Sequence, residues 1–347
     1  MLEASYCKYI LKFIQPAITS RATMLEKETF FIKIHDIEDP NIFGIGECAI
    51  FRGLSSDDIP NFESILKTIC DDINTINISD IKYSSIRFGL ETALADLKNG
   101  GKHIIYDTKW RQGNSSIPIN GLVWMGSYDD MFKRINEKIS NGFNCIKLKI
   151  GGIKFEDELK LLNYIRSSFP ISKLQIRLDA NGAFSAQDAL SYLDQLSVYN
   201  IHSIEQPIKP KQWNELAIIC KNSPIPIALD EELLGINDME LKNQIIQFIN
   251  PSFLVLKPSL CGGFYGAEEW INVADRHKIG WWATSALESN IGLNAIAQWI
   301  STKEVSMPQG LGTGLLFSNN IKSPIEQINN VLIYNTTKQW DLESMVF

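Results

Sequence analysis

Five short apolar runs, beginning at residue 145, each end in a charged residue and recur at an even spacing. The charged residues are Lys149, Asp179, Glu205, Asp230 and Lys257, so the steps between them are 30, 26, 25 and 27 residues. One β-strand followed by one helix takes roughly 25–30 residues. The spacing therefore predicts consecutive strand–helix units in a parallel sheet, with the five charged side chains at one end of the strands.

The first run contains two lysines, Lys147 and Lys149, two residues apart. Side chains alternate along a strand, so both lysines lie on one face and Leu148 on the other. An edge strand with a solvated lysine face would also carry such a pair. Because a buried parallel strand rarely contains even one lysine, the four in-phase runs that follow favour a functional site over that alternative.

Helical patterns lie between these runs, and together they predict a (β/α) barrel, a modified TIM barrel, over residues 102–318. Further strands are expected at 117–124 and 280–285. Helices are expected near 127–141, 155–168, 185–199, 213–223, 239–244, 263–277 and 290–301. Residues 311–317 are compatible with either a short eighth strand or a loop.

The first hundred residues have a different pattern, which predicts an α+β capping domain over residues 1–101. The short turn after Asp39 indicates an antiparallel meander of strands. Strands are expected at 1–15, 28–34 and 42–48, loops at 15–22 and 51–55, and helices at 58–74 and 84–99. The tail, 319–347, with an apolar stretch at 331–334, is expected to fold back onto this domain and complete it.

The composition limits the classes of partner. The 347 residues are 45% hydrophobic and 21% charged, as in ordinary soluble globular proteins. A net charge of −7 argues against a broad surface for nucleic acid or an anionic membrane, so a small anionic carboxylate substrate would need a local positive site. The six scattered cysteines indicate reduced thiols and a cytoplasmic protein, and the chain shows no export signal or membrane-spanning run. The oligomeric state is not indicated.

Asp179, Glu205 and Asp230 would bring three carboxylates from adjacent strand ends to one place. Oxygen ligands without His or Cys suit a hard cation, above all Mg²⁺. Each acid could instead be a helix cap or first-turn residue after its strand. Because structure alone seldom requires several buried charges together, the metal site is the favoured interpretation.

Lys149 and Lys257 would then flank a substrate bound at the metal. A neighbouring cation lowers a lysine's pKa, so Lys147 and the metal would make Lys149 usable as a neutral base. The chemistry that needs this arrangement is removal of a proton α to a carboxylate, with the metal stabilising the resulting anion.

The motifs resemble those of the enolase superfamily, muconate-lactonizing subgroup. They are Lys147-Leu-Lys149, Asp179-Ala-Asn181, Glu205-Gln-Pro207, Asp230-Glu231 and Lys257-Pro258. The resemblance implies that Lys149 and Lys257 are catalytic and that Asp179, Glu205 and Asp230 bind Mg²⁺, for which Mn²⁺ could substitute. Lys147, Arg177, Asn181 and Glu231 would support them, Arg177 and Asn181 through a buried network on the face of Asp179.

Within the subgroup, the stretches at 120–125, 257–263 and 285–292 resemble the o-succinylbenzoate synthases of menaquinone biosynthesis. This implies a carbon–oxygen lyase that dehydrates 2-succinyl-6-hydroxy-2,4-cyclohexadiene-1-carboxylate to 2-succinylbenzoate. Dipeptide epimerases and N-succinylamino acid racemases share the lysine pair, so 1,1-proton transfer is the alternative. A barrel that only binds a ligand is more remote, because none of the five charged residues is missing.

Two capping loops are expected to close over the barrel mouth and contact the far part of the substrate. Thr19, Arg21 and Arg52 are the candidates there, the arginines because guanidinium groups suit a second carboxylate. Ordinary surface turns are an equal alternative. Ser285 and Glu288 close the strand at 280–285 and are expected either to contact substrate or to cap the next helix, and the glycine-rich stretch at 310–314 is expected to be a flexible loop.

Overall fold

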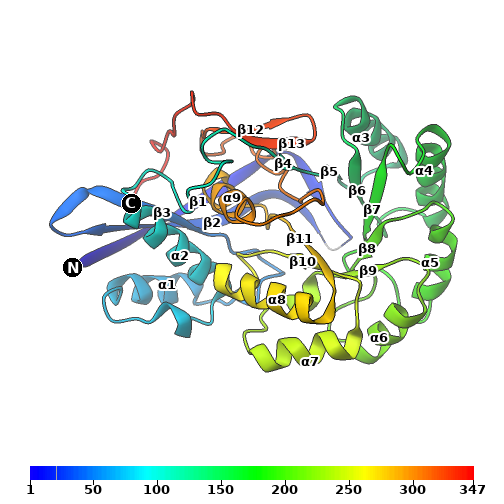
Figure 1. Cartoon of the computed structure of the whole chain (residues 1–347), viewed down its shortest axis with the longest axis horizontal. Coiled ribbons are helices and arrows are strands. Elements are labelled where there is room, and N and C mark those ends of the chain that lie inside the picture. The colour runs from blue at the N-terminus through cyan, green and yellow to red at the C-terminus, as the bar shows by residue number, and fades with distance from the viewer. Residues whose placement is uncertain (21) are drawn as a thin grey trace.

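The computed structural model describes residues 1–20 and 22–347. It has two parts: an antiparallel sheet with two helices, and a ring of parallel strands surrounded by helices (Figure 1). Both termini lie on the side of the antiparallel sheet (Figure 1). The fold class expected from the sequence, a modified TIM barrel with an α+β cap, is therefore confirmed.

The capping part consists of β1 (Leu2–Ile18), β2 (Thr23–Asp36) and β3 (Asp39–Cys48), followed by α1 (Phe62–Asp71), the 3₁₀ turn Ile78–Asp80 and α2 (Ser84–Lys98). The predicted antiparallel meander is confirmed. The loop expected at 15–22 is partly wrong, because β1 continues to Ile18 after a shift in its register between Lys12 and Ala17. α2 packs very closely on β3, since a Cβ at Gly46 would lie 1.8 Å from the Gly89 carbonyl oxygen. Only glycine permits that approach.

The parallel sheet confirms the predicted succession of strands and helices. Its order is β11-β10-β9-β8-β7-β6-β5, so consecutive strands are neighbours. The strands are β5 (Gly121–Val123), β6 (Cys145–Lys149), β7 (Gln175–Asp179), β8 (Ser203–Glu205), β9 (Ile227–Leu229), β10 (Phe253–Leu256) and β11 (Gly280–Ala283). The helices are α3 (Tyr128–Ser140), α4 (Phe155–Ser168), α5 (Ala189–Ser197), α6 (Trp213–Asn222), α7 (Met239–Ile249), α8 (Gly263–His277) and α9 (Asn290–Ile300).

The ring is closed by Gln309 and Gly310, which form parallel bridges with Ile119 on one side and Thr284 on the other. A Cβ at Gly310 would lie 2.2 Å from Thr284 Oγ1, so this contact needs glycine. The eighth strand position is thus filled just before the stretch at 311–317, which consists of turns. Of the two alternatives left open for that stretch, the loop is the one the structure contains.

The tail was expected to fold back onto the first domain, and its last residues do so, whereas its apolar strand pairs elsewhere. β13 (Val331–Tyr334) pairs with β12 (Ile325–Ile328) and with β4 (Ile117–Pro118), which leads into the barrel. The last residues do reach the capping sheet, because Met345 is buried in a cluster with Cys7 and Phe31. The tail therefore contacts both parts of the molecule.

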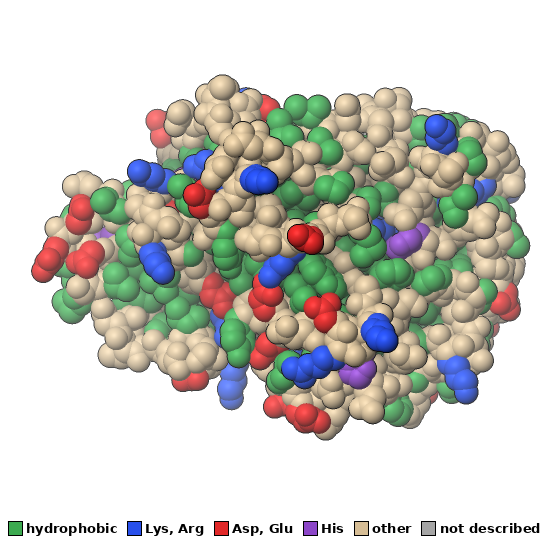
Figure 2. Space-filling view, viewed as in Figure 1, with side chains coloured by type: hydrophobic (Ala, Val, Ile, Leu, Met, Phe, Trp, Pro, Cys, Tyr) green, Lys and Arg blue, Asp and Glu red, His purple; other side chains and the backbone are tan. Residues whose placement is uncertain are grey.

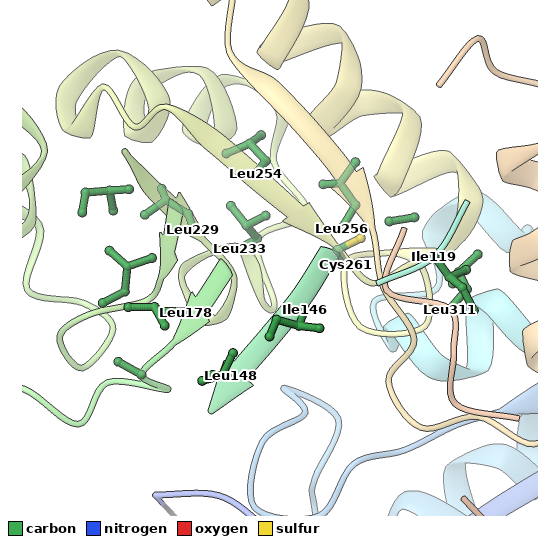
Figure 3. Packing of buried hydrophobic residues seen from close by; sticks show 14 of the residues in the cluster. Ile119, Ile146, Leu148, Leu178, Leu229, Leu233, Leu254, Leu256, Cys261 and Leu311 are labelled. Atoms are coloured by element: carbon green, nitrogen blue, oxygen red, sulfur yellow. The ribbon is translucent and has the colours of Figure 1, made fainter. Parts of the chain in front are cut away.

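The main core lies between the barrel strands and the helices around them. Figure 3 shows Ile146 and Leu148 of β6 together with Leu178 of β7 and Leu254 of β10 in this layer. Because side chains alternate along each strand, the lysines and acids between these apolar residues face the interior of the ring. Charged side chains of both signs are interspersed on the face shown in Figure 2. No helix within residues 1–20 and 22–347 is long and apolar enough to cross a bilayer.

Candidate active site

The strand register brings the predicted charged residues side by side at one end of the barrel. Lys149 pairs with Asp179 across β6 and β7, and Asp179 pairs with Glu205 across β7 and β8. Asp230 directly follows β9 and Lys257 directly follows β10. The parallel arrangement is the reason, since the carboxyl ends of all the strands meet at the same edge.

These side chains form a buried network of ion pairs. The ammonium group of Lys147 lies 2.9 Å from Asp179 Oδ2 and 3.0 Å from Glu205 Oε2. Lys149 Nζ donates to Asp179 Oδ2 at 2.5 Å and to Asn181 Oδ1 at 2.8 Å. On the other side of the mouth, Lys257 is paired with Asp230. Lysines from opposite sides therefore hold the carboxylates between them.

The two flanking lysines differ in electrostatic environment. Burial lowers the pKa of Lys149, and Lys147 adds to this, so that the attraction of Asp179 does not restore the ordinary value. Burial also acts to lower the pKa of Lys257, but Asp230, Glu205 and Glu231 outweigh it and the pKa is raised. Lys149 is thus the lysine that loses its proton more readily, and Lys257 is the one that keeps it.

The acids fit a hard cation by their chemistry. Burial, with Asp179 close by, raises the pKa of Glu205. Glu205 Oε1 and Asp230 Oδ1 are buried and form no hydrogen bond within the described chain. A divalent cation would satisfy both oxygens and relieve the repulsion between the carboxylates. Within residues 1–20 and 22–347, no group of three or more His, Cys, Asp or Glu side chains is already placed so that it could hold a metal ion.

Of the expected supporting residues, Asn181 and Glu231 lie at the mouth. Asn181 Nδ2 donates to Glu231 Oε1 at 2.9 Å, and the Asn181 backbone N–H donates to Asp179 Oδ1 at 3.1 Å. Arg177 lies deeper in the barrel, where its Nη1 donates to the Pro308 carbonyl at 2.8 Å and its guanidinium stacks 4.2 Å from the Trp282 ring. Asn181 therefore links Lys149 to the surrounding acids, whereas Arg177 belongs to the layer below them.

A cavity of about 70 Å³ opens onto this network. Lys147, Lys149 and Lys257 reach it, while the three carboxylates lie behind them and are at most 1% exposed. Its wall is completed by the capping residues Thr19, Met24, Phe51 and Leu54 and by Asn120, Leu122, Trp124, Asn181, Thr284, Ser285, Ala286, Leu287, Gly310, Gly312 and Thr313. The cavity is therefore mainly apolar, with cationic groups on its floor.

Ser285 and Glu288, both predicted to contact substrate, are bound to each other. Glu288 is fully buried and accepts hydrogen bonds from the hydroxyl groups of Ser259 and Ser285 and, at 2.8 Å, from the Ala286 N–H. The only hydroxyl proton of Ser285 is thus committed to Glu288, and Glu288 does not line the cavity. Glu288 instead holds the strand ends that carry Lys257 and Ser285 together.

The capping candidates are only partly brought together. Thr19 lines the cavity, whereas Arg21 lies outside the described residues. Arg52 does not line the cavity. Its guanidinium is bound to Glu28 and, at 2.8 Å, to Asp58. The loop at 51–55 reaches the mouth instead through its apolar side chains, Phe51 and Leu54.

Two wall residues, Asn120 and Thr313, were not predicted as site residues. Asn120 belongs to a stretch that was used only for its resemblance, and Thr313 to the glycine-rich stretch at 310–314. A polar residue just before a barrel strand and another just after the closing bridge were the available signals. These signals can be recognised as site residues only when the closure of the ring is known, because the closure places both residues in the same cavity wall as the lysines.

Comparisons with known proteins agree with this geometry. Residues 130–317, more than half of the chain, match the family described as Enolase C-terminal domain-like. An o-succinylbenzoate synthase of Desulfotalea psychrophila is 41% identical over 93% of this chain and 96% of its own length. The solved structure of MenC from Desulfotalea psychrophila has a TM-score of 0.85 at 37% identity, covering 96% of this chain and 99% of that one.

A D-Ala-D/L-Ala epimerase of Cytophaga hutchinsonii is also similar, at 26% identity over 88% of this chain and 85% of its own. The lysine pair and the carboxylates at successive strand ends, the capped barrel and the family match all agree. The chain belongs to the enolase superfamily.

Proposed function

We propose that this protein is a carbon–oxygen lyase that dehydrates 2-succinyl-6-hydroxy-2,4-cyclohexadiene-1-carboxylate to 2-succinylbenzoate, a step of menaquinone biosynthesis. The observation that carries the proposal is that Lys149 and Lys257 reach one apolar cavity from opposite sides, with three carboxylates behind them. The 41% identity to an o-succinylbenzoate synthase over nearly the whole chain supports the choice of substrate.

Lys149 has the central role in the proposed reaction. Its neutral amine accepts the ring proton α to the carboxylate. The carbon–oxygen bond then breaks, and Lys149 returns the proton to the departing hydroxyl, which leaves as water. The ring becomes aromatic, and the proton and the hydroxyl group leave together as water, so no other reactant is needed. A base placed in a dry cavity next to a second cation is suited to this exchange.

Lys257 acts as a fixed cation on the opposite side of the ring. It keeps its proton because Asp230, Glu205 and Glu231 favour the charged form over the effect of burial. A preorganised positive charge stabilises the anion that forms when the ring proton leaves. Lys147, paired with Asp179 and Glu205, keeps the acids and Lys149 in register.

We assign Asp179, Glu205 and Asp230 as ligands of a divalent cation, Mg²⁺ with Mn²⁺ as a substitute, with Asn181, Glu231 and Arg177 as supporting residues. Superfamily members use a divalent metal, and Glu205 Oε1 and Asp230 Oδ1, which have no hydrogen-bond partner in the described part of the chain, suit one. When bound, the metal supplies a positive charge to the carboxylate of the substrate, which makes the adjacent carbon more acidic.

Residues 1–101 with the tail 319–347 are proposed as the capping domain, and residues 102–318 as the catalytic domain. Phe51 and Leu54 of the capping part shield the lysines from water. A cytoplasmic location is proposed because all six cysteines are free thiols. The substrate is a small carboxylate anion, and neither nucleic acid nor a membrane is proposed as a partner.

The second candidate is 1,1-proton transfer, favoured by one observation: lysines lie on both sides of the cavity. The two reactions can be separated in one experiment. The purified protein with Mg²⁺ is given the cyclohexadiene substrate, and formation of the aromatic product is followed by ultraviolet absorbance. In parallel, dipeptides in D₂O are examined for deuterium at the α-carbon. Exchange into dipeptides without aromatic product would establish the second candidate instead.

A further inference from the structure

Two polar groups in the cavity wall have no hydrogen-bond partner among the described residues. Asn120 is 3% exposed and Thr313 is 4% exposed. Asn120 Oδ1 and Thr313 Oγ1 are both buried and form no hydrogen bond within residues 1–20 and 22–347. A buried polar group left without a hydrogen bond is costly, so two of them in one small cavity point to a ligand that satisfies them.

The two residues lie on neighbouring segments at the closure of the barrel. The Asn120 N–H donates to the Gln309 carbonyl at 3.0 Å, and Thr313 follows four residues later in the same segment. A Cβ on Gly312 would lie 3.5 Å from the Asn120 carbonyl oxygen, so the loop carrying Thr313 packs directly against Asn120. Leu122, two residues after Asn120, pairs in register with Lys147 on the neighbouring strand β6. The pair therefore lies on the side of the cavity next to the base-bearing strand.

Three other neutral polar side chains of the cavity, Thr284, Ser285 and Asn181, are already bound. Ser285 donates to Glu288, and Thr284 Oγ1 donates to the Gly310 carbonyl at 3.1 Å. Asn181 is held by Lys149 and Glu231. The remaining polar atoms of the floor belong to lysines, which suit a carboxylate. Asn120 and Thr313 are uncharged and suit an uncharged oxygen.

We propose that Asn120 and Thr313 together bind the ketone oxygen of the succinyl side chain and so select substrates with an acyl group beside the reacting carbon. The Thr313 hydroxyl donates one hydrogen bond. The Asn120 carboxamide donates a second from Nδ2, because a half-turn about χ2 exchanges its oxygen and nitrogen and no partner in the described chain fixes Oδ1. This inference rests on the proposed function.

The test compares two ligands that differ only at that oxygen. These are 2-succinylbenzoate and 4-(2-carboxyphenyl)butanoate, in which the ketone is replaced by a methylene. Their dissociation constants are measured by calorimetry with Mg²⁺ present. The wild type should bind the ketone about tenfold or more tightly, and N120L and T313V should each remove most of that preference. T313S, which keeps the hydroxyl, should retain it.

The matched control is T92V, because Thr92 Oγ1 is also buried without a partner in the described chain but lies on α2, outside the cavity wall. T92V should leave the preference unchanged. Equal weakening of both ligands by N120L and T313V, or no weakening of either, would overturn the proposed contact. Thermal unfolding of each variant identifies loss of fold. Wild-type turnover of the cyclohexadiene substrate is scored separately, so failure of the contact and failure of the proposed function give different results.

Discussion

Glu47 Oε2 on β3 accepts a hydrogen bond of 2.6 Å from the hydroxyl of Ser289, the residue that caps α9, although 242 positions separate them in the sequence. The same carboxylate accepts the backbone N–H groups of Ser289 and Gly292, each at 2.9 Å, and the Thr29 hydroxyl at 2.8 Å. One buried acid of the capping sheet thus satisfies the beginning of a barrel helix. These hydrogen bonds hold the capping sheet against the barrel beside the segment that contributes Ser285 and Leu287 to the cavity.

Replacing Glu47 with alanine should therefore destabilise the protein by about 2–4 kcal/mol, because four buried donors lose this acceptor at once. Urea unfolding would measure the change. Glu215→Ala, an exposed acid on α6, is the control and should change the free energy of unfolding by less than about 0.5 kcal/mol. Equal stability of the two variants would contradict the role assigned to Glu47.

Glu205→Gln should weaken metal binding by at least about a hundredfold without loss of the fold. Burial and the neighbouring Asp179 both disfavour the Glu205 charge, so the neutral variant should be at least as stable as the wild type without metal. Calorimetric titration with Mg²⁺ gives the affinity, and urea unfolding in a chelator gives the stability. Chelation should abolish wild-type turnover, and Mg²⁺ or Mn²⁺ should restore it. Full turnover of metal-free protein would rule out this site.

Lys149→Ala should lower kcat by about a thousandfold or more, because the variant has no group that can take the ring proton and return it to the hydroxyl. Ultraviolet detection of the aromatic product provides the rate. Lys173→Ala, an exposed lysine before β7, serves as the control and should keep wild-type kcat. If Lys149→Ala retained more than about a tenth of the activity, another base would have to be found.

Glu158 predicts a pH-dependent stability. Burial raises its pKa from 4.5 to about 7, although Oε1 accepts the Gly151 N–H at 2.6 Å. The folded state therefore holds this proton more tightly than the unfolded chain, and stability is lost as the pH rises from about 4.5 to about 7. Glu158→Gln should match the wild type near pH 4.5 and exceed its free energy of unfolding by up to about 3 kcal/mol at pH 9.

Urea unfolding of the wild type and Glu158→Gln at several pH values would measure this difference. Glu156→Gln, at the beginning of the same helix, is a suitable control because its side chain is more exposed than that of Glu158. A difference between wild type and Glu158→Gln that did not change with pH would show that the Glu158 carboxyl is not perturbed by burial.

Arg52→Ala tests the corrected role of that residue. Because the guanidinium is bound to Glu28 and Asp58 and does not line the cavity, the variant should change KM less than about twofold. Its partly exposed ion pairs contribute at most about 1 kcal/mol, so stability should fall only slightly. A large increase in KM with unchanged kcat would instead favour the original expectation of substrate binding. Arg21 lies outside the described residues, so its expected contact with a second carboxylate stays a prediction.

The sequence by itself determined the barrel and the residues at its mouth. Alternation along each strand put Leu148 and Leu178 on the helix-facing side and Lys149 and Asp179 on the other. Because parallel strands must end at the same edge, the even spacing of the charged residues was enough to expect them to meet. Both features follow from the alternation of residues along each strand and from the parallel direction of the strands, and both can be recognised in the sequence.

Only the tertiary structure decided which hydrogen-bond or ion-pair partner each polar group has. Arg52 meets Glu28 and Asp58, Ser285 meets Glu288, and β13 joins β4 instead of the first domain. The ring is closed by Gln309 and Gly310, and that closure places Asn120 and Thr313 in the cavity wall, where Asn120 Oδ1 and Thr313 Oγ1 have no hydrogen-bond partner among the described residues. Such pairings depend on contacts between segments far apart in the chain, so no local pattern of hydrophobic and polar residues specifies them.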